Sequence, residues 1–238
     1  MDKLGNIIFK YRNVIFPIFF ALLLFRTMPA FDWEHFEKWG YPIGLAVALT
    51  GQTIRALTIG LVYIIRGGRK RKVYAETLVK TGMFAHCRNP LYLGNILIVT
   101  GLGIFANSIL FYYIGIPLFI FMYMAIIVAE ENYLTGKFGE EYIEYCRNVN
   151  RFMPNLSGIR ETIGSMTFHW RRLIVKEYGT TYMWIICMIL LILKNQYLRY
   201  GHEVNKTVIL ILSLLSFFVT LLYAVARYLK KSRRLTAD

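Results

Sequence analysis

Long apolar segments, separated by short polar ones, constrain this chain more than any other feature. Six of them have the character of membrane helices: Val14–Met28, Ile43–Ile65, Leu91–Ala106, Ile109–Ala129, Thr181–Leu193 and Val208–Tyr228. The longest exceed the roughly 20 residues that a helix needs to cross a bilayer. Leu91–Ala106 is shorter, and the tight turn at Asn107-Ser108 predicts that it forms a helical hairpin with the next segment. We therefore expect an all-α fold, a polytopic transmembrane bundle of about six spans.

The composition favours the same class. Of the 238 residues, 56% are hydrophobic and only 18% are charged, whereas about a quarter of the residues in soluble chains are charged. Cys87, Cys146 and Cys187 are widely spaced, so they predict neither a disulfide framework nor a metal site.

The net charge of +14 raises the question of a nucleic-acid partner, and the distribution of the basic residues argues against one. With the N-terminus inside, 22 of the 28 Lys and Arg residues fall on the inner segments. This asymmetry predicts that both termini are cytoplasmic, in a bacterial inner membrane or the endoplasmic reticulum. The charge is then explained by membrane topology.

We expect three parts along the chain. Residues 1–65 would form two N-terminal spans, and residues 66–154 a core containing the hairpin and a cytoplasmic-side pocket. Residues 155–238 would add an interfacial helix over Arg160–Tyr178 and two C-terminal spans. In Arg160–Tyr178 apolar and charged side chains fall on opposite helical faces, which is typical of a helix lying on a membrane surface.

The second span carries small residues and one charge on a single helical face. Gly44, Ala48, Gly51, Arg55 and Thr58 recur at steps of three and four. Small residues allow another helix to approach closely, within the chain or in a homodimer. Arg55 lies about 15 Å from either end of the span, too deep to reach water. It has either a structural partner, such as carbonyls of a neighbouring helix, or a role in binding substrate or cofactor.

Two polar clusters flank the hairpin, and folding would bring them together. Arg88 is a planar cation suited to a carboxylate, and Glu130 and Glu131 could accept hydrogen bonds from ribose hydroxyls or an ammonium. Nearby aromatic residues offer flat faces for an adenine and electron-rich rings for a cation: Tyr92, Phe138, Tyr142 and Tyr145. S-adenosylmethionine combines all the ligand groups that these side chains could bind: a carboxylate, a ribose, an adenine and a cation. Singly, each residue also suits a structural role as a membrane anchor, a solvated helix end or an interfacial aromatic.

The spacing of the clusters resembles the isoprenylcysteine carboxyl methyltransferase and phospholipid methyltransferase superfamily of integral membrane enzymes. The two matching motifs cover about a third of the chain: Gly82-x-Phe84-x-x-x-Arg88-Asn89-Pro90-x-Tyr92-x-Gly94 and Glu130-Glu131-x-x-Leu134-x-x-x-Phe138-Gly139-x-x-Tyr142-x-x-Tyr145. The resemblance implies an S-adenosylmethionine pocket whose cofactor residues are Arg88, Asn89, Tyr92, Gly94, Glu130, Glu131, Tyr142 and Tyr145. Many members carry histidine at Asn89, and we expect His86 nearby to be a surface residue.

The resemblance also implies the reaction, a methyl transfer to a lipid or lipidated acceptor. A carboxylate acceptor needs no base, whereas an amine does, and Glu130 is a candidate for that base. Arg151 could meet an acidic substrate group, so Arg151 and Glu130 are the predicted catalytic residues and Arg55 and Arg151 the predicted substrate contacts.

Two alternatives remain open. One is an NADPH-dependent membrane sterol or enone reductase, for which the basic loop Arg66–Lys72 could bind the 2′-phosphate. The other is a non-catalytic lipid-binding membrane module.

Overall fold

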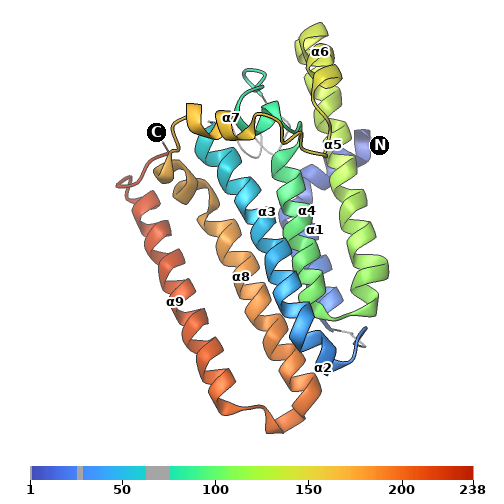
Figure 1. Ribbon diagram of the computed structural model, residues 1–238, viewed down its shortest axis with the longest axis vertical. Helices are drawn as coiled ribbons and strands as arrows, with labels where there is room; N and C mark the ends of the chain where they lie inside the picture. The colour runs from blue at the N-terminus through green and yellow to red at the C-terminus, as the bar shows by residue number, and fades with distance from the viewer. Residues whose placement is uncertain (1, 26–28, 63–74, 238) are drawn as a thin grey trace.

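The computed structural model describes residues 2–25, 29–62 and 75–237, and these residues fold into a bundle of helices (Figure 1). The long helices are α1 (Asp2–Phe25), α3 (Tyr41–Leu61), α4 (Pro90–Ala106), α5 (Ile116–Phe138), α8 (Trp170–Tyr200) and α9 (Lys206–Lys231). Three shorter ones are α2 (Trp33–His35), α6 (Glu140–Asn148) and α7 (Ile159–Ser165). Within the described ranges no strand forms, so the all-α prediction is confirmed there.

Four described stretches are long and apolar enough to cross a membrane, in place of the six that we expected: Trp33–Leu61, Phe111–Phe138, Trp170–Glu203 and Lys206–Lys231. The helix α4 has only 17 residues and lies inside the bundle (Figure 1). The helix α1 starts at Asp2, and its first half carries Lys3, Lys10 and Arg12, which shortens its apolar part. The described residues therefore form a helical bundle with four candidate spans, and the expected span Val14–Met28 ends outside them.

The helices α3 and α4 pack closely because glycines face each other. A Cβ atom on Gly51 would lie 2.5 Å from the Gly94 carbonyl oxygen, and one on Gly101 would lie 2.6 Å from the Gly44 carbonyl oxygen. Neither position tolerates a side chain. The small-residue face predicted on the second span is thus used inside the chain, so it is not free for a homodimer. Oligomeric state stays a prediction.

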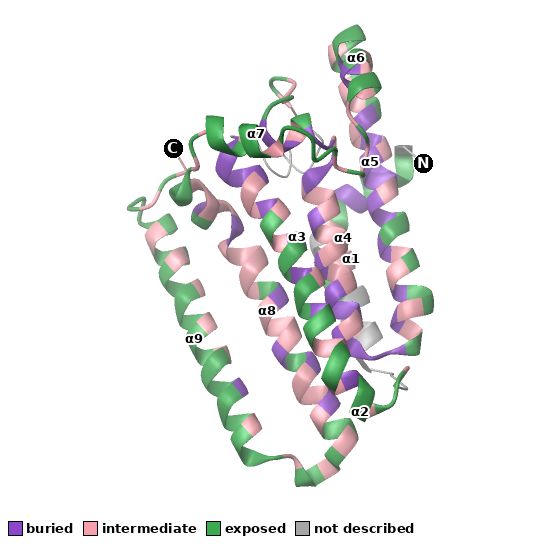
Figure 2. Cartoon of the chain, viewed as in Figure 1, coloured by how far each residue is buried: buried purple, intermediate pink, exposed green. Residues whose placement is uncertain are grey.

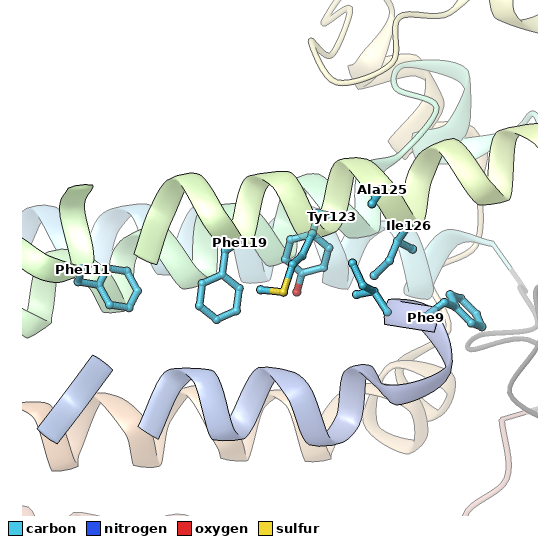
Figure 3. Packing of buried hydrophobic residues seen from close by; sticks show 8 residues of the cluster. Phe9, Phe111, Phe119, Tyr123, Ala125 and Ile126 are labelled. Atoms are coloured by element: carbon cyan, nitrogen blue, oxygen red, sulfur yellow. The ribbon is translucent and has the colours of Figure 1, made fainter. Parts of the chain in front are cut away.

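Two buried clusters lie on either side of α4. On one side, α1 lies against α5, whose Phe119 and Tyr123 point toward it (Figure 3). The Phe16 ring of α1 meets the Tyr123 and Phe119 rings edge-on at 5.1 Å and 5.5 Å. On the other side, Leu102 and Phe105 of α4 join side chains from α3 and α8, including Trp184. The central, short helix α4 is therefore the element that connects the two halves of the bundle.

Residues 160–178 do not form the single interfacial helix that we expected. The helix α7 ends at Ser165, and α8 begins at Trp170 and continues for 31 residues. At the break, the His169 amide donates to the Gly60 carbonyl at 2.9 Å. The Phe168 ring occupies the space beside Gly60, where a Cβ atom would lie 2.2 Å from it. The segment between α7 and α8 is thus held against the end of α3.

The helix α9 lies at the edge of the bundle and presents its apolar side chains outward (Figures 1 and 2). Phe217, for example, is 70% exposed. Such a surface suits contact with lipid. The N-terminus and the last turn of α9 lie at the same end of the bundle, which also carries α6 and α7 (Figure 1).

Candidate functional site

A cavity of about 890 Å³ lies among α1, α3, α4, α5, α6 and α8. This volume is at the upper end of the range of about 300–1,000 Å³ usual for small-molecule pockets. Both polar clusters reach it, although some forty positions separate them in the sequence. Among the predicted cofactor residues, those that line the cavity are Arg88, Asn89, Tyr92, Glu130, Glu131, Tyr142 and Tyr145.

Glu131 is the point at which three chain segments meet. Its carboxylate receives Arg151 Nη2 at 2.6 Å and Asn89 Nδ2 at 3.3 Å, and Arg88 Nη1 lies 3.6 Å away. Arg88 and Asn89 precede α4, Glu131 belongs to α5, and Arg151 follows α6. Two guanidinium groups therefore share one carboxylate at this end of the cavity.

Arg88 has one donor that the described part of the chain leaves unused. Its side chain is only 14% exposed, and its Nε atom is buried without a hydrogen-bond partner in that part. A buried donor without an acceptor is unfavourable, and native proteins rarely keep one without a reason. Because Arg88 also lines the cavity, its guanidinium is a candidate to bind an anionic group there.

Glu130 lies in different surroundings, although it is the next residue in the sequence. Adjacent residues of an α-helix point about 100° apart. Glu130 Oε1 accepts a 2.7 Å hydrogen bond from the Tyr92 hydroxyl, and Arg12 of α1 lines the same cavity. The Glu131 carboxylate is thus held by two arginines and an amide, whereas the Glu130 carboxylate is held by the Tyr92 hydroxyl.

The helix α6 contributes two tyrosines because the chain turns sharply at Gly139. Gly139 has a φ of +54°, a conformation that residues with a side chain rarely adopt. The Tyr145 hydroxyl donates to the Phe84 carbonyl at 2.7 Å, and its ring lies 6.0 Å from that of Tyr142. Burial raises the pKa of both tyrosine hydroxyls, so both stay neutral at physiological pH.

Residues 75–79 also line the cavity, and sequence reasoning did not find them. They precede the first motif and carry no periodicity or charge pattern of their own. Lys80 beside them pairs with Glu141 of α6 at 2.7 Å, and Lys137 of α5 donates to the Ala75 carbonyl. The predicted basic loop Arg66–Lys72 lies outside the described residues.

The profile of the phospholipid methyltransferase family matches residues 43–141. The cobalt-zinc-cadmium resistance protein CzcN of Cupriavidus metallidurans is 33% identical over 160 residues, which cover 65% of this chain and 68% of that protein. This chain belongs to the phospholipid methyltransferase family. The nickel-cobalt-cadmium resistance protein NccN of Alcaligenes xylosoxydans xylosoxydans, also similar, is 29% identical over 67% of this chain and 72% of its own length. No solved structure matches the chain.

The stretch matched by the family profile runs from α3 into α6. It includes Arg88, Glu130 and Glu131 but ends before Tyr142, Arg151 and the whole of α8. One wall of the cavity therefore lies beyond it, since Gly179, Thr180, Met183, Trp184 and Cys187 of α8 also line the cavity.

Arg55 has a structural partner, one of the two readings left open by its sequence position. It is 1% exposed, and its Nε and Nη2 atoms donate to the two carboxylate oxygens of Glu177 at 2.8 Å and 2.7 Å. Its Nη1 atom donates to the Leu91 carbonyl at 3.2 Å and to Asn95 Oδ1. Every guanidinium nitrogen is thus hydrogen-bonded within the protein, although Arg55 also lines the cavity, so the predicted substrate contact stays a prediction.

Three other predicted residues take unexpected positions. Gly94 faces α3, where a Cβ atom would lie 2.5 Å from Arg55 Cγ, so it allows the two helices to pack, and it is not among the residues that line the cavity. The Arg151 side chain is 41% exposed and bound to Glu131 at the rim. The predicted surface residue His86 is instead 5% exposed, because Nδ1 meets the Asn155 carbonyl at 2.6 Å and Nε2 the Thr162 hydroxyl at 2.8 Å.

Away from the polar cluster the cavity continues as an apolar arm. Along α4 it runs from Pro90 to Leu102, which corresponds to about 18 Å at helical rise. Phe119 and Tyr123 of α5 and Met183 of α8 complete the walls of this arm. The cavity thus combines a charged end with a long apolar arm, the two halves of a lipid-like ligand.

Proposed function

We propose that the chain is an integral membrane methyltransferase that uses S-adenosylmethionine to methylate a lipid or a lipidated acceptor. One observation carries this proposal: Arg88, whose buried Nε atom has no hydrogen-bond partner in the described part of the chain, lines a cavity that has Glu131 at one end and an apolar arm at the other. Membership of the phospholipid methyltransferase family supports the same reaction class.

The residues at the charged end fit such a donor. The Arg88 guanidinium would bind its amino-acid carboxylate, and the Tyr142 and Tyr145 rings would face its adenine. Glu131 is already surrounded by Arg88, Asn89 and Arg151, so its part is to hold these side chains in position. When bound, S-adenosylmethionine supplies an activated methyl group.

The protein then has to align the reacting groups and exclude water. Glu130 faces the cavity and would accept the proton of an ammonium acceptor, while the Tyr92 hydroxyl holds the carboxylate in one orientation. A carboxylate acceptor would need no base, and Arg151 at the rim would bind an acidic group of that substrate. The apolar arm would take the hydrocarbon chain, which enters sideways from the bilayer.

The proposal is tested with purified protein in detergent, radiolabelled methyl donor and a native lipid extract. A labelled lipid is the expected product, and Arg88→Ala should abolish donor binding measured by calorimetry. Arg147→Ala is the matched control, because Arg147 is an exposed residue of α6. If the parent protein neither binds the donor nor labels a lipid, the proposal is wrong. Oxidation of NADPH in the same assay would instead support the reductase alternative.

The names of the two relatives suggest where the product could matter. Both are named as resistance proteins for metals that include cobalt and cadmium. We propose that methylation by this chain contributes to tolerance of these ions. Cells that rely on the protein should lose tolerance when Arg88→Ala replaces the parent, and keep it with Arg147→Ala. If cells with Arg88→Ala tolerate the metals as well as cells with Arg147→Ala, this chain does not contribute to metal tolerance through methylation.

A further inference from the structure

Gly179 is a half-buried glycine that lines the cavity from the first half of α8. A Cβ atom built on it meets no atom within 4 Å. Glycine inside a helix is unfavourable relative to alanine, so its presence in a 31-residue helix needs a reason.

The other interior glycines have different explanations. Gly51, Gly94 and Gly101 allow α3 and α4 to approach, because a Cβ atom on each would collide with the facing backbone. Gly136 and Gly164 also have no atoms near a built Cβ, but both are exposed at the surface. Gly179 alone among these six glycines lines the cavity. The missing side chain at this position therefore widens the cavity itself.

Contacts on both sides of Gly179 fix its position. Two residues earlier, Glu177 binds Arg55, which also bonds to the Leu91 carbonyl in the first turn of α4. Five residues later, Trp184 donates to Gln52 at 2.9 Å and packs in the same cluster as Leu102. Gly179 thus lies between the charged end of the cavity and its apolar arm.

We infer that Gly179 determines how bulky a hydrocarbon chain the cavity accepts, at the point where the chain leaves the polar head group. The inference rests on the proposed function and deepens it, because it assigns acceptor selection to α8. This helix lies outside the stretch that matches the family profile, which ends at residue 141. The rigid anchors at Glu177 and Trp184 prevent α8 from moving away to admit a larger group.

Binding of a hydrocarbon chain can be measured without methyl transfer, because Trp184 lines the apolar arm. Trp33, Trp39 and Trp170 are replaced by Phe, which leaves Trp184 as the single tryptophan. The protein is reconstituted into phosphatidylcholine vesicles and titrated with a fatty acid brominated along its chain, a quencher of tryptophan fluorescence. We expect saturable quenching in this parent.

Gly179→Leu should raise the half-quenching concentration by about tenfold or more, since its side chain would occupy space that the hydrocarbon chain needs. Gly179→Ala should give a smaller increase, and Gly164→Leu, the control at an exposed glycine, none. Circular dichroism confirms that each variant is folded. Equal quenching of the parent and Gly179→Leu would overturn the inference, as would quenching that never saturates. Donor binding by the parent is measured separately by calorimetry. If the parent binds no donor, the proposed function fails while the quenching result stands.

Discussion

At the scale of single residues, Arg55 and Glu177 show how a charge is stabilised inside this bundle. Their side chains are 1% and 3% exposed, and two parallel hydrogen bonds join them. The remaining Arg55 donors go to α4, so this one arginine ties three helices together. A buried pair of this kind contributes little compared with apolar residues of the same shape, but removing one partner leaves an unpaired buried charge.

Glu177→Ala should therefore reduce the free energy of unfolding by about 3–5 kcal/mol. The double variant Arg55→Met/Glu177→Leu should recover much of that loss, because no charge then remains buried. Denaturation in mild detergent, followed by circular dichroism, measures both. The exposed pair Lys80–Glu141 is the control, with side chains 45% and 51% exposed, and Glu141→Gln should cost less than about 1 kcal/mol. A loss from Glu177→Ala no larger than this control would contradict a structural role for the pair.

Cys87 gives a second prediction at this scale. Its side chain is 1% exposed and its thiol lies 3.5 Å from the carbonyl oxygens of Arg151 and Phe152. Burial raises the pKa of this thiol above its usual value of 9.0. The unfolded chain therefore loses its thiol proton first as the pH rises, so the contribution of Cys87 to stability is present below pH 9 and falls above it.

Burial should also slow the alkylation of Cys87. Cys87 in the folded protein should react with iodoacetamide far more slowly than in the denatured protein, over the whole range from pH 7 to the pKa of the free thiol, because only the thiolate reacts. Mass spectrometry of the peptide that contains Cys87 measures the rate at each pH. Equal rates in the two states would mean that the thiol is accessible.

At the scale of elements, the contact between α3 and α4 depends on glycine and not on large apolar side chains. Both helices bring backbone against backbone, which leaves no room for a Cβ atom at Gly44, Gly51, Gly94 or Gly101. This close approach places Arg55 beside the first turn of α4 and so sets the depth of the cavity. The helix pair is thus a rigid frame against which α8 and α5 are arranged.

Gly101→Val should destabilise the protein by about 3 kcal/mol or more, since its Cβ would meet the Gly44 backbone, which cannot move aside. The expected result is a lower yield of monodisperse protein in detergent and a lower melting temperature. Gly164→Val should change neither, because nothing lies within 4 Å of its Cβ. If Gly101→Val and Gly164→Val give the same yield and melting temperature, α3 and α4 do not approach each other as closely as described.

At the scale of the whole molecule, the sequence predicts the helical class and the convergence of Arg88 with Glu131, because a short hairpin must bring its ends together. It predicts a span at Thr181–Leu193, within α8, but not that this helix begins at Trp170. Charged residues such as Arg171, Arg172 and Glu177 are compatible with water, a membrane surface or a buried partner, and only Arg55, 122 positions away, decides for Glu177. Residues 75–79 were missed for a related reason. The course of the backbone brings them to the cavity, and their side chains follow no pattern that would predict it.

The orientation in the membrane follows from the bundle together with its charge. The N-terminus, α6, α7 and the end of α9 lie at one end (Figure 1), and the last turn of α9 carries Lys230 and Lys231. The positive-inside rule predicts that this end is cytoplasmic. The charged part of the cavity, next to α6, would then be open to a soluble methyl donor.

Reporter fusions in a bacterial host test this orientation. Green fluorescent protein fused after Asp238 should fluoresce, because it folds in the cytoplasm, and alkaline phosphatase at the same position should be inactive. A chain truncated after Glu203 lacks α9, so its end lies at the opposite face of the bundle, and both readouts should reverse. Identical readouts from the full and truncated chains would show that α9 does not cross the membrane. If the full chain gives active phosphatase, the positive charge does not mark the cytoplasmic side. The cavity would then face a compartment without S-adenosylmethionine.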